Sequence, residues 1–384
     1  MRLIILSINS NLQSMANLKD RRTFLKTLGG AAAISPFISS SSFAASLPNY
    51  TGKKLGIALV GLGSYATRQI GVALEETEYW KVTGIVTGSP EKIPAWKTKW
   101  SLKDENIYSY ENFDKIADNK EIDVVYILLP NGLHKEYTIR AAKAGKHVIC
   151  EKPMANTADE AEEMVKACEA AGVKLAVGYR LHFEPFNMQA QKWGKEQTFG
   201  HLDYIHAAFA FKIGDPKQWR LKKALSGGGP MMDVGIYCVQ AARYVSGEEP
   251  ISVTAQYGPI TDKERFSEVE ESVSWQMEFP SGTYMTGWTS YKSNTERLHA
   301  SGPQGSFDLS PVFGYGPLKG TSRLGPMDLP IVHHQRAQME AMGPMFLSDD
   351  PIPSHCSGEE GLRDMKIMMA IFEAAKTGKK IKLG

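Results

Sequence analysis

The chain has 384 residues, of which 42% are hydrophobic, and its formal net charge is +2. This length accommodates two domains of ordinary size. The near balance of charges gives no broad electrostatic footprint for nucleic acid or for an anionic membrane surface. No C-x-x-C pair occurs among the four cysteines, which are Cys150, Cys168, Cys238 and Cys356. We therefore expect packed thiols and neither a zinc knuckle nor a disulfide scaffold.

The first 45 residues have the pattern of an export signal. Residues 20–31 are DRRTFLKTLGGA, with paired arginines at Arg21 and Arg22, and small residues around Ala44-Ala45 offer a cleavage site. The pattern resembles a twin-arginine signal, which predicts a periplasmic protein. The alternative interpretation is a disordered basic leader.

The apolar run of this leader is short and is broken by Pro36, so we expect no stable membrane insertion. Met15 is an alternative start, which would leave residues 1–14 upstream of the protein. After cleavage, residues 46–53 would form a short arm before the folded part.

From residue 54 the pattern alternates between strands and helices. Apolar runs that end in glycine or proline predict buried strands, and the amphipathic stretches between them predict helices. Strands spaced by helices indicate βαβ units, so we interpret residues 54–180 as an α/β domain with a parallel sheet. The predicted strands are residues 55–63, 80–88, 122–130, 146–153 and 174–180, and the predicted helices are 67–77, 93–100, 134–145 and 158–172.

A glycine-rich turn follows the first predicted strand and opens the first helix. Gly61 permits a tight turn, Gly63 lets the backbone approach a pyrophosphate, and Ala66 lets the helix pack closely on the strand. Leu62 and Tyr65 lie in the same turn, and the helix N-terminus behind it favours an anion. We therefore predict a dinucleotide site here. The alternative is a plain glycine turn.

The end of the second predicted strand indicates which dinucleotide binds. An NAD site usually places an acidic residue there, which accepts hydrogen bonds from the ribose hydroxyls. This chain has Thr87 and Ser89 at that position and Lys92 one turn further, while Glu91 is interpreted as a solvated residue at a helix start. Hydroxyl donors and a positive charge suit a 2′-phosphate. We predict NADP, with NAD as the alternative.

After residue 181 the pattern changes to longer strands joined by turns. Apolar and polar residues alternate in residues 272–279, which marks a sheet with one buried face. We interpret residues 181–384 as an α+β domain on a large, mostly antiparallel open sheet. An apolar face on such a sheet predicts a homodimer or homotetramer. The predicted strands are residues 201–211, 251–258, 272–279 and 283–291, and the predicted helices are 232–245 and 359–378.

Three residues indicate proton chemistry. Lys152 follows a predicted parallel strand, at the end where open α/β sheets bind ligands, and its ammonium can bind a substrate hydroxyl. Asp233 and Tyr237 lie four residues apart and so share one face of a helix. A tyrosine beside a cation can accept a proton from a hydroxyl and return one to a carbonyl, because the charge stabilises the phenolate. The alternatives are a surface lysine and a structural hydrogen bond within the helix.

Three motifs together resemble one enzyme family. They are the glycine turn, the segment Pro130-Asn131-Gly132-Leu133-His134, and the tetrapeptide Cys150-Glu151-Lys152-Pro153. With several longer segments, they make residues 54–384 similar to the family of glucose–fructose oxidoreductase and inositol dehydrogenase. The resemblance is greatest to the glucose–fructose oxidoreductases, since many other members have histidine at position 237. It implies a nucleotide-binding Rossmann domain, a large open-sheet domain and an active site between them.

The resemblance also implies individual contacts. Those to the cofactor extend to Tyr110, Leu129, Pro130, Asn131, His134, Glu151, Lys152, Arg180, Trp219 and Arg220. Those to the substrate involve Lys152, Arg180, His182, Asp233 and Tyr237. A buried histidine is the alternative for His182, and a core tryptophan is the alternative for Trp219. His333 and His334 look like a metal pair, but no third ligand accompanies them and the family's chemistry needs no metal, so we assign none.

These observations predict a periplasmic sugar oxidoreductase that contains NADP. An aldose would be oxidised to an aldonolactone, and a second sugar or carbonyl would then be reduced in the same pocket. The alternatives are a simple dehydrogenase with exchangeable NAD(P), a redox-assisted glycosidase and a nucleotide-sensing regulator. The arm at residues 46–53 is shorter than the proline-rich arm that encloses the nucleotide in glucose–fructose oxidoreductase. A shorter arm would cover less of the nucleotide, which argues against firm retention of the cofactor.

Overall fold

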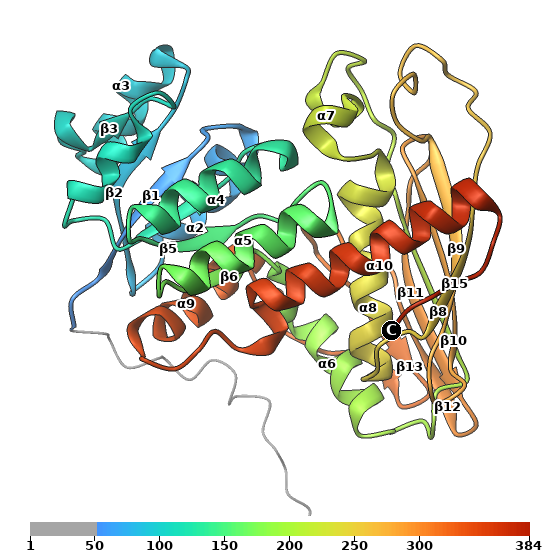
Figure 1. Ribbon diagram of the computed structural model, residues 1–384. Coiled ribbons are helices and arrows are strands. Elements are labelled where there is room, and N and C mark those ends of the chain that lie inside the picture. The colour runs from blue at the N-terminus through green and yellow to red at the C-terminus, as the bar shows by residue number, and fades with distance from the viewer. Residues whose placement is uncertain (1–51) are drawn as a thin grey trace, which may run out of the picture. The chain divides into compact units, whose positions relative to one another are not determined.

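The computed structural model describes residues 52–384, and the predicted export signal lies outside the described residues. The first part of this chain forms a six-stranded parallel sheet with strand order β3-β2-β1-β4-β5-β6 (Figure 1). Its strands are β1 (Leu55–Val60), β2 (Trp80–Val86), β3 (Ile107–Tyr108), β4 (Val124–Ile127), β5 (His147–Cys150) and β6 (Leu175–Val177). The parallel sheet predicted for this part of the chain is confirmed.

The central strands are buried on both faces, because helices connect each strand to the next. The α-helices are α2 (Gly71–Glu75), α3 (Ile93–Trp100), α4 (His134–Lys143) and α5 (Ala158–Ala170). A π-helical turn at Ala66–Ile70 precedes α2. Residues 113–118, between β3 and β4, form a 3-10 helix.

The second part of the chain forms a nine-stranded sheet with strand order β14-β13-β12-β11-β7-β10-β9-β8-β15. Only β7 and β10 pair in parallel, and the other neighbours are antiparallel, as the sequence predicts. Its strands are β7 (Tyr204–Ala210), β8 (Ser252–Tyr257), β9 (Ser272–Glu278), β10 (Tyr284–Ser290), β11 (Thr295–Gly302), β12 (Gly305–Leu309), β13 (Gly320–Ser322), β14 (Gly325–Pro326) and β15 (Ile381–Lys382).

The apolar face of this sheet is covered by helices of the same chain. Helix α8 (Ile236–Ser246) packs on β7 and β10, and α10 (Gly358–Thr377) packs on β8 and β9. On β9, Trp275 and Met277 are buried, while Ser274 and Gln276 on the opposite face are exposed. The uncovered face is therefore polar. The apolar face gives no argument for a second subunit, and the predicted oligomer stays a prediction.

Three further helices occur in the second part, and the sequence analysis did not find them. They are α6 (Pro185–Lys195), α7 (Lys223–Ser226) and α9 (His334–Leu347). Helix α9 packs against α2, and its Met339 carbonyl accepts a hydrogen bond of 2.6 Å from the Trp80 indole of β2. The chain therefore returns to the first sheet after completing the second.

All four cysteines are buried free thiols, as predicted. Among the helices of residues 52–384, none has both the length and the apolar character needed to cross a bilayer.

Candidate active site

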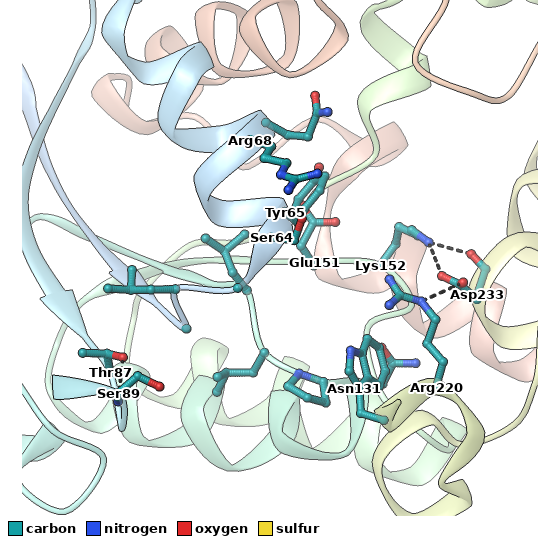
Figure 2. Close-up of a pocket in the computed structure, with 18 of the residues that line it drawn as sticks. Ser64, Tyr65, Arg68, Thr87, Ser89, Asn131, Glu151, Lys152, Arg220 and Asp233 are labelled. Carbon is teal, nitrogen blue, oxygen red and sulfur yellow. Dashed lines mark hydrogen bonds and ion pairs between the residues drawn. The ribbon is translucent and has the colours of Figure 1, made fainter. Parts of the chain in front are cut away.

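One large cavity, with a volume of about 660 Å³, extends from the glycine turn to helix α8 (Figure 2). Thr87 and Ser89 lie at one end, and Lys152, Arg220 and Asp233 lie at the other. The walls come from both parts of the chain. The lining residues are Gly61, Leu62, Gly63, Ser64, Tyr65, Arg68, Gln69, Thr87, Ser89, Lys92, Tyr110, Leu128, Leu129, Pro130, Asn131, Glu151, Lys152, Trp219, Arg220, Asp233, Tyr237 and Tyr315.

The glycine turn presents bare backbone to the cavity. Gly61 has a φ of +93°, and a Cβ there would lie 2.8 Å from a methyl of Leu129 and 3.0 Å from the Leu128 carbonyl. A Cβ on Gly63 would meet nothing within 4 Å, so the space in front of this residue is open. A phosphate group can therefore approach the main chain at Gly63. This geometry fits a dinucleotide.

The end of β2 carries polar groups and no carboxylate that lines the cavity. The Ser89 amide donates to the Thr87 hydroxyl over 3.0 Å, which fixes the turn after the strand. The Lys92 ammonium donates to the Leu62 carbonyl over 3.1 Å and so ties this turn to the glycine turn. The two carboxylates in the cavity wall, Glu151 and Asp233, lie away from Thr87 and Ser89. The donor set thus fits the 2′-phosphate of NADP.

The catalytic candidates meet at the opposite end of the cavity. The Lys152 ammonium donates to the Asp233 carbonyl over 2.6 Å and lies 3.6 Å from its carboxylate. It also lies 4.6 Å from the centre of the Tyr237 ring. The ammonium is therefore shared between Asp233 and the face of the tyrosine.

The Asp233 carboxylate is held by donors on its other side. Arg220 donates to it over 2.9 Å and Tyr291 over 3.0 Å. Burial alone would raise the pKa of Asp233, but the charges of Arg220 and Lys152 outweigh burial and lower it. The side chain therefore remains ionised and holds both cations at this end of the cavity.

Glu151, the residue before Lys152, is buried against the first sheet. Its carboxylate accepts a hydrogen bond of 2.6 Å from the Tyr126 hydroxyl. Burial raises its pKa, and the bond from Tyr126 and the charge of Lys152 oppose that effect. Glu151 thus anchors the segment that presents Lys152 and reaches the cavity with only a small part of its surface.

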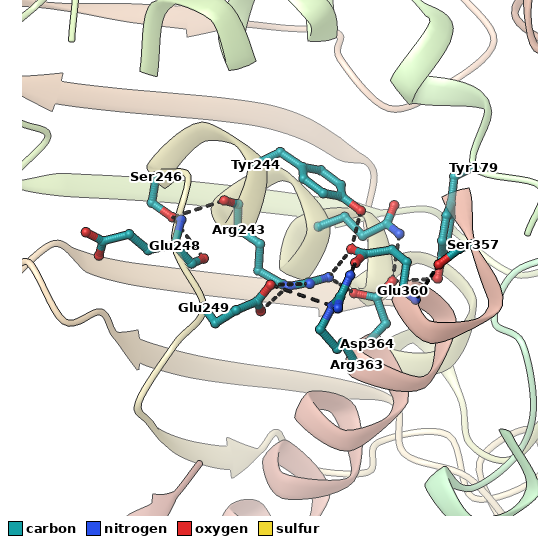
Figure 3. Close-up of polar contacts among 11 residues, drawn as sticks. Tyr179, Arg243, Tyr244, Ser246, Glu248, Glu249, Ser357, Glu360, Arg363 and Asp364 are labelled. Atoms are coloured by element: carbon teal, nitrogen blue, oxygen red, sulfur yellow. Dashed lines mark hydrogen bonds and ion pairs between the residues drawn. The ribbon is translucent and has the colours of Figure 1, made fainter. Parts of the chain in front are cut away.

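The helix that presents Asp233 and Tyr237 begins with a π-helical turn at Met231–Gly235 and continues as α8. A buried ionic network anchors its far end (Figure 3). Arg243 of α8 donates to Glu360 and to Asp364 of α10, each over 2.6 Å. Asp364 also accepts a bond of 2.6 Å from Tyr179, which follows β6. The network therefore joins α8, α10 and the end of the first sheet.

Four predicted contact residues do not line the cavity. Ala66 is buried beneath the glycine turn. His134 is buried. Its Nε2 lies 2.8 Å from the Leu129 carbonyl and its Nδ1 lies 3.0 Å from the Pro153 carbonyl, so the ring supports the segment that carries Lys152. His182 is buried beside Tyr244, with ring centroids 4.0 Å apart. Burial lowers the pKa of His182 to about 3, so it is neutral.

Arg180 is the fourth of these residues. Its side chain is buried, and its guanidinium donates to the Gly314 carbonyl over 3.0 Å, to the Phe313 carbonyl and to His334 over 2.7 Å. The carbon of the guanidinium lies 5.0 Å from the centre of the Tyr237 ring. Arg180 therefore lies against the tyrosine ring and is not among the residues that line the cavity.

The histidines at 333 and 334 have other partners. His333 accepts a bond from the Arg336 amide at the start of α9. His334 accepts from Arg180, which requires an unprotonated ring nitrogen, and burial lowers its pKa to about 3. Among residues 52–384 there is no cluster of three or more metal-type ligands.

Sequence reasoning missed several residues at the cavity. Ser64, Arg68 and Gln69 belong to the helix that the glycine turn opens, and their spacing from Tyr65 could have indicated them. Tyr315 lines the cavity, and Tyr291 donates to Asp233 without lining it; both follow strands of the second sheet and belong to no recognisable motif. No local signal in the sequence indicates either tyrosine.

Comparisons with known proteins agree with this architecture. Residues 55–179 match the family described as oxidoreductase family, NAD-binding Rossmann fold, and residues 187–308 match the GFO/IDH/MocA C-terminal domain. The solved structure of the aldose-aldose oxidoreductase from Caulobacter crescentus, complexed with glycerol, is 40% identical to this chain. It covers 86% of this chain and 100% of its own, with a TM-score of 0.83.

Two curated relatives have lower identity. The D-xylose 1-dehydrogenase [NADP(+)] of Haloarcula marismortui is 28% identical over 344 residues, which is 87% of this chain and 94% of the relative. The D-glucoside 3-dehydrogenase of Escherichia coli is 28% identical over 287 residues, which is 68% of this chain and 79% of the relative.

Proposed function

The chain belongs to the Gfo/Idh/MocA family of oxidoreductases, and from this premise we propose that it is a sugar oxidoreductase that uses NADP. In the proposed reaction an aldose is oxidised to an aldonolactone and leaves. A second sugar or carbonyl compound then enters the same pocket and is reduced. The activities for which the relatives are named support sugars as the substrates, and the name of the Haloarcula enzyme supports NADP.

One arrangement of side chains supports this proposal most strongly. The Lys152 ammonium, the Asp233 carboxylate and the Tyr237 ring meet at one end of a cavity that a bare glycine turn also lines. A dinucleotide seated on the turn would extend toward these three residues. They are groups that can bind a hydroxyl and move its proton.

The residues that would hold NADP are the glycine turn from Gly61 to Ala66 and the group of Thr87, Ser89 and Lys92. Bound there, NADP would accept the hydride from the sugar carbon in the first half of the reaction and supply it in the second. The remaining task for the protein is to orient the sugar and to move one proton.

We assign the proton transfer to Tyr237. Its phenol oxygen accepts the proton of the sugar hydroxyl that becomes the carbonyl oxygen, and later returns a proton to the carbonyl oxygen of the second substrate. The Lys152 ammonium lies 4.6 Å from the ring centre, so a positive charge accompanies the tyrosine in both steps. Asp233 keeps the ammonium in place, and Lys152 binds the reacting hydroxyl with its remaining donors.

We also propose that the protein works in the periplasm. The twin-arginine pattern at Arg21 and Arg22 belongs to a route that carries folded proteins, so the cofactor can be bound before export. Because free NADP is a cytoplasmic coenzyme, an exported enzyme needs a second substrate that restores its own cofactor. A dimer or tetramer through the open sheet remains a prediction.

The second candidate is a dehydrogenase with exchangeable coenzyme. The short arm at residues 46–53 favours it, and the Haloarcula relative is named as a dehydrogenase. This candidate requires added NADP for every turnover, whereas the leading proposal does not.

The experiment that separates them begins with purified, extensively dialysed protein. Absorbance of reduced nicotinamide is recorded after an aldose alone and again after a second carbonyl substrate. We expect the signal to appear with the aldose and to disappear with the second substrate, without added coenzyme. A protein that is empty after dialysis and that turns over only with added NADP would support the exchangeable dehydrogenase. A protein that changes no sugar under either condition would contradict both candidates.

A further inference from the structure

Tyr315 occupies a position at the cavity that no sequence motif indicates. It lies in the loop between β12 and β13 and lines the same cavity as Lys152 and Tyr237. Its residue surface is 57% exposed, which is unusual for a large aromatic residue in a folded domain. An aromatic ring that is held at the mouth of a polar cavity and left half uncovered is suited to contact a ligand.

Hydrogen bonds fix the loop that carries Tyr315. Arg180, which is buried, donates to the main-chain carbonyls of Phe313 and Gly314, the two residues immediately before Tyr315. The carbon of its guanidinium lies 4.8 Å from the centre of the Tyr315 ring and 5.0 Å from that of Tyr237. One buried cation therefore fixes the loop and lies against both tyrosines.

A carboxylate of β11 holds the same loop from the other side. Glu296 accepts hydrogen bonds from the amides of Phe313 and Gly314, over 3.0 Å and 2.7 Å. The carbonyl and amide groups of both residues thus have charged partners. The position of Tyr315 is preorganised, which reduces the entropy lost when a ligand binds against it.

The Tyr315 side chain lines the cavity together with charged and polar groups. Burial of part of the side chain raises its pKa, and Tyr237 adds to the effect, while Arg180 opposes it. The negative charges of Glu151 and Asp233 also raise the pKa of Tyr315. Tyr315 is therefore partly exposed and lines the same cavity as Lys152, Glu151 and Asp233.

Resting on the proposed function, we propose that Tyr315 forms a wall of the sugar subsite and determines how tightly an aldose is held. Its ring would cover the apolar C–H face of a pyranose, and its hydroxyl would bond to a sugar hydroxyl other than the reacting one. Arg180 is the positioning residue for this wall. The same contact serves both sugars of the proposed reaction, because both occupy one pocket.

The test compares Tyr315→Phe and Tyr315→Ala with the unchanged protein. Sugar affinity is measured by calorimetry with glucose and with xylose, which lacks the hydroxymethyl group, on protein saturated with NADP. Tyr315→Phe should weaken sugar binding about two- to tenfold, the effect of one neutral hydrogen bond. Tyr315→Ala should weaken it about ten- to a hundredfold, because the aromatic contact is lost as well. NADP affinity should not change.

Tyr257→Ala is the matched control, since Tyr257 is also partly exposed, at 37%, but belongs to β8 and does not line the cavity. It should leave sugar affinity unchanged. If the unchanged protein turns sugars over but Tyr315→Ala binds them equally well, the assignment of Tyr315 is wrong and the proposed function stands. If the unchanged protein neither binds nor turns over any sugar, the proposed function fails and the sugar subsite fails with it.

Discussion

Replacing Tyr237 with phenylalanine removes the one group that we assign to proton transfer and little else. The ring is 8% exposed and packs against Phe209 and Phe313, with centroid distances of 5.7 Å and 6.3 Å. Phenylalanine keeps this ring and its contacts, so the fold and the neighbouring cations should stay in place. Any large loss of activity would then come from the missing hydroxyl.

The size of the loss follows from the kind of catalysis. General acid–base assistance by a positioned side chain is typically worth about 10²–10⁴-fold in rate, or roughly 3–5 kcal/mol of transition-state stabilisation. We expect kcat to fall within this range. NADP affinity should change little, because Thr87 and Ser89 of the predicted nucleotide site lie at the other end of the cavity.

The assay is a single turnover, in which reduced nicotinamide is followed by absorbance after an aldose is mixed with NADP-loaded protein. Tyr204→Phe is the matched control, since it deletes a tyrosine hydroxyl that bonds to Thr286 at 2.6 Å, outside the cavity wall. A Tyr237→Phe rate within a few-fold of the unchanged protein would refute the assignment. An equal loss in the control would attribute the effect to destabilisation.

Further predictions concern the coenzyme, the glycine turn, the pH dependence and the export signal. Lys92→Ala should weaken NADP by about ten- to a hundredfold and NAD much less, because a charge-assisted bond to the 2′-phosphate is lost; equal effects in a binding titration would contradict the choice of NADP. Gly61→Ala should impair binding of both nucleotides, since its φ is +93° and its Cβ would clash with Leu129; an unchanged titration would show that the turn does not hold them. His334 has a pKa lowered by burial from 6.5 to about 3, so both states are neutral above pH 6.5, and below it only the unfolded state binds the proton. The free energy of unfolding should therefore fall by about 2 kcal/mol between pH 7 and pH 5 on account of this residue, and urea titrations of His334→Gln should show a correspondingly shallower fall. Changing Arg21 and Arg22 to lysine should retain the protein in the cytoplasmic fraction, and unchanged periplasmic recovery would exclude the twin-arginine route.

The elements that sequence analysis predicted are those whose pattern is local. The strands of the first sheet are apolar runs between amphipathic helices, and their burial on both faces produces that signal. Helix α9 was missed because Gly343 and Pro344 interrupt its pattern near the end. Helix α6 did carry a start signal, since the Glu184 side chain caps it and Pro185 occupies its first turn.

In the candidate site too, the residues that were predicted are those with a local sequence pattern. The glycine turn, the end of β2 and Lys152 all lie at carboxyl ends of parallel strands, where the sequence specifies position. Tyr315 reaches the cavity only because the loop after β12 folds back toward Arg180, which lies more than a hundred residues earlier in the chain. Such a contact depends on the packing of the two sheets and leaves no periodic pattern in the sequence.

The two cations that the sequence placed at the strand ends illustrate why position alone does not assign a role. Arg180 and Lys152 both follow parallel strands, but a buried guanidinium must find partners for its donors within the protein. Arg180 uses three of its five N–H donors on two carbonyls and on His334, and its side chain does not line the cavity. Lys152 has three donors and makes one short bond, to the Asp233 carbonyl, with its charge balanced by the carboxylate at 3.6 Å. Its remaining donors face the cavity, and for this reason we assign the reacting hydroxyl to Lys152 and only a positioning role to Arg180.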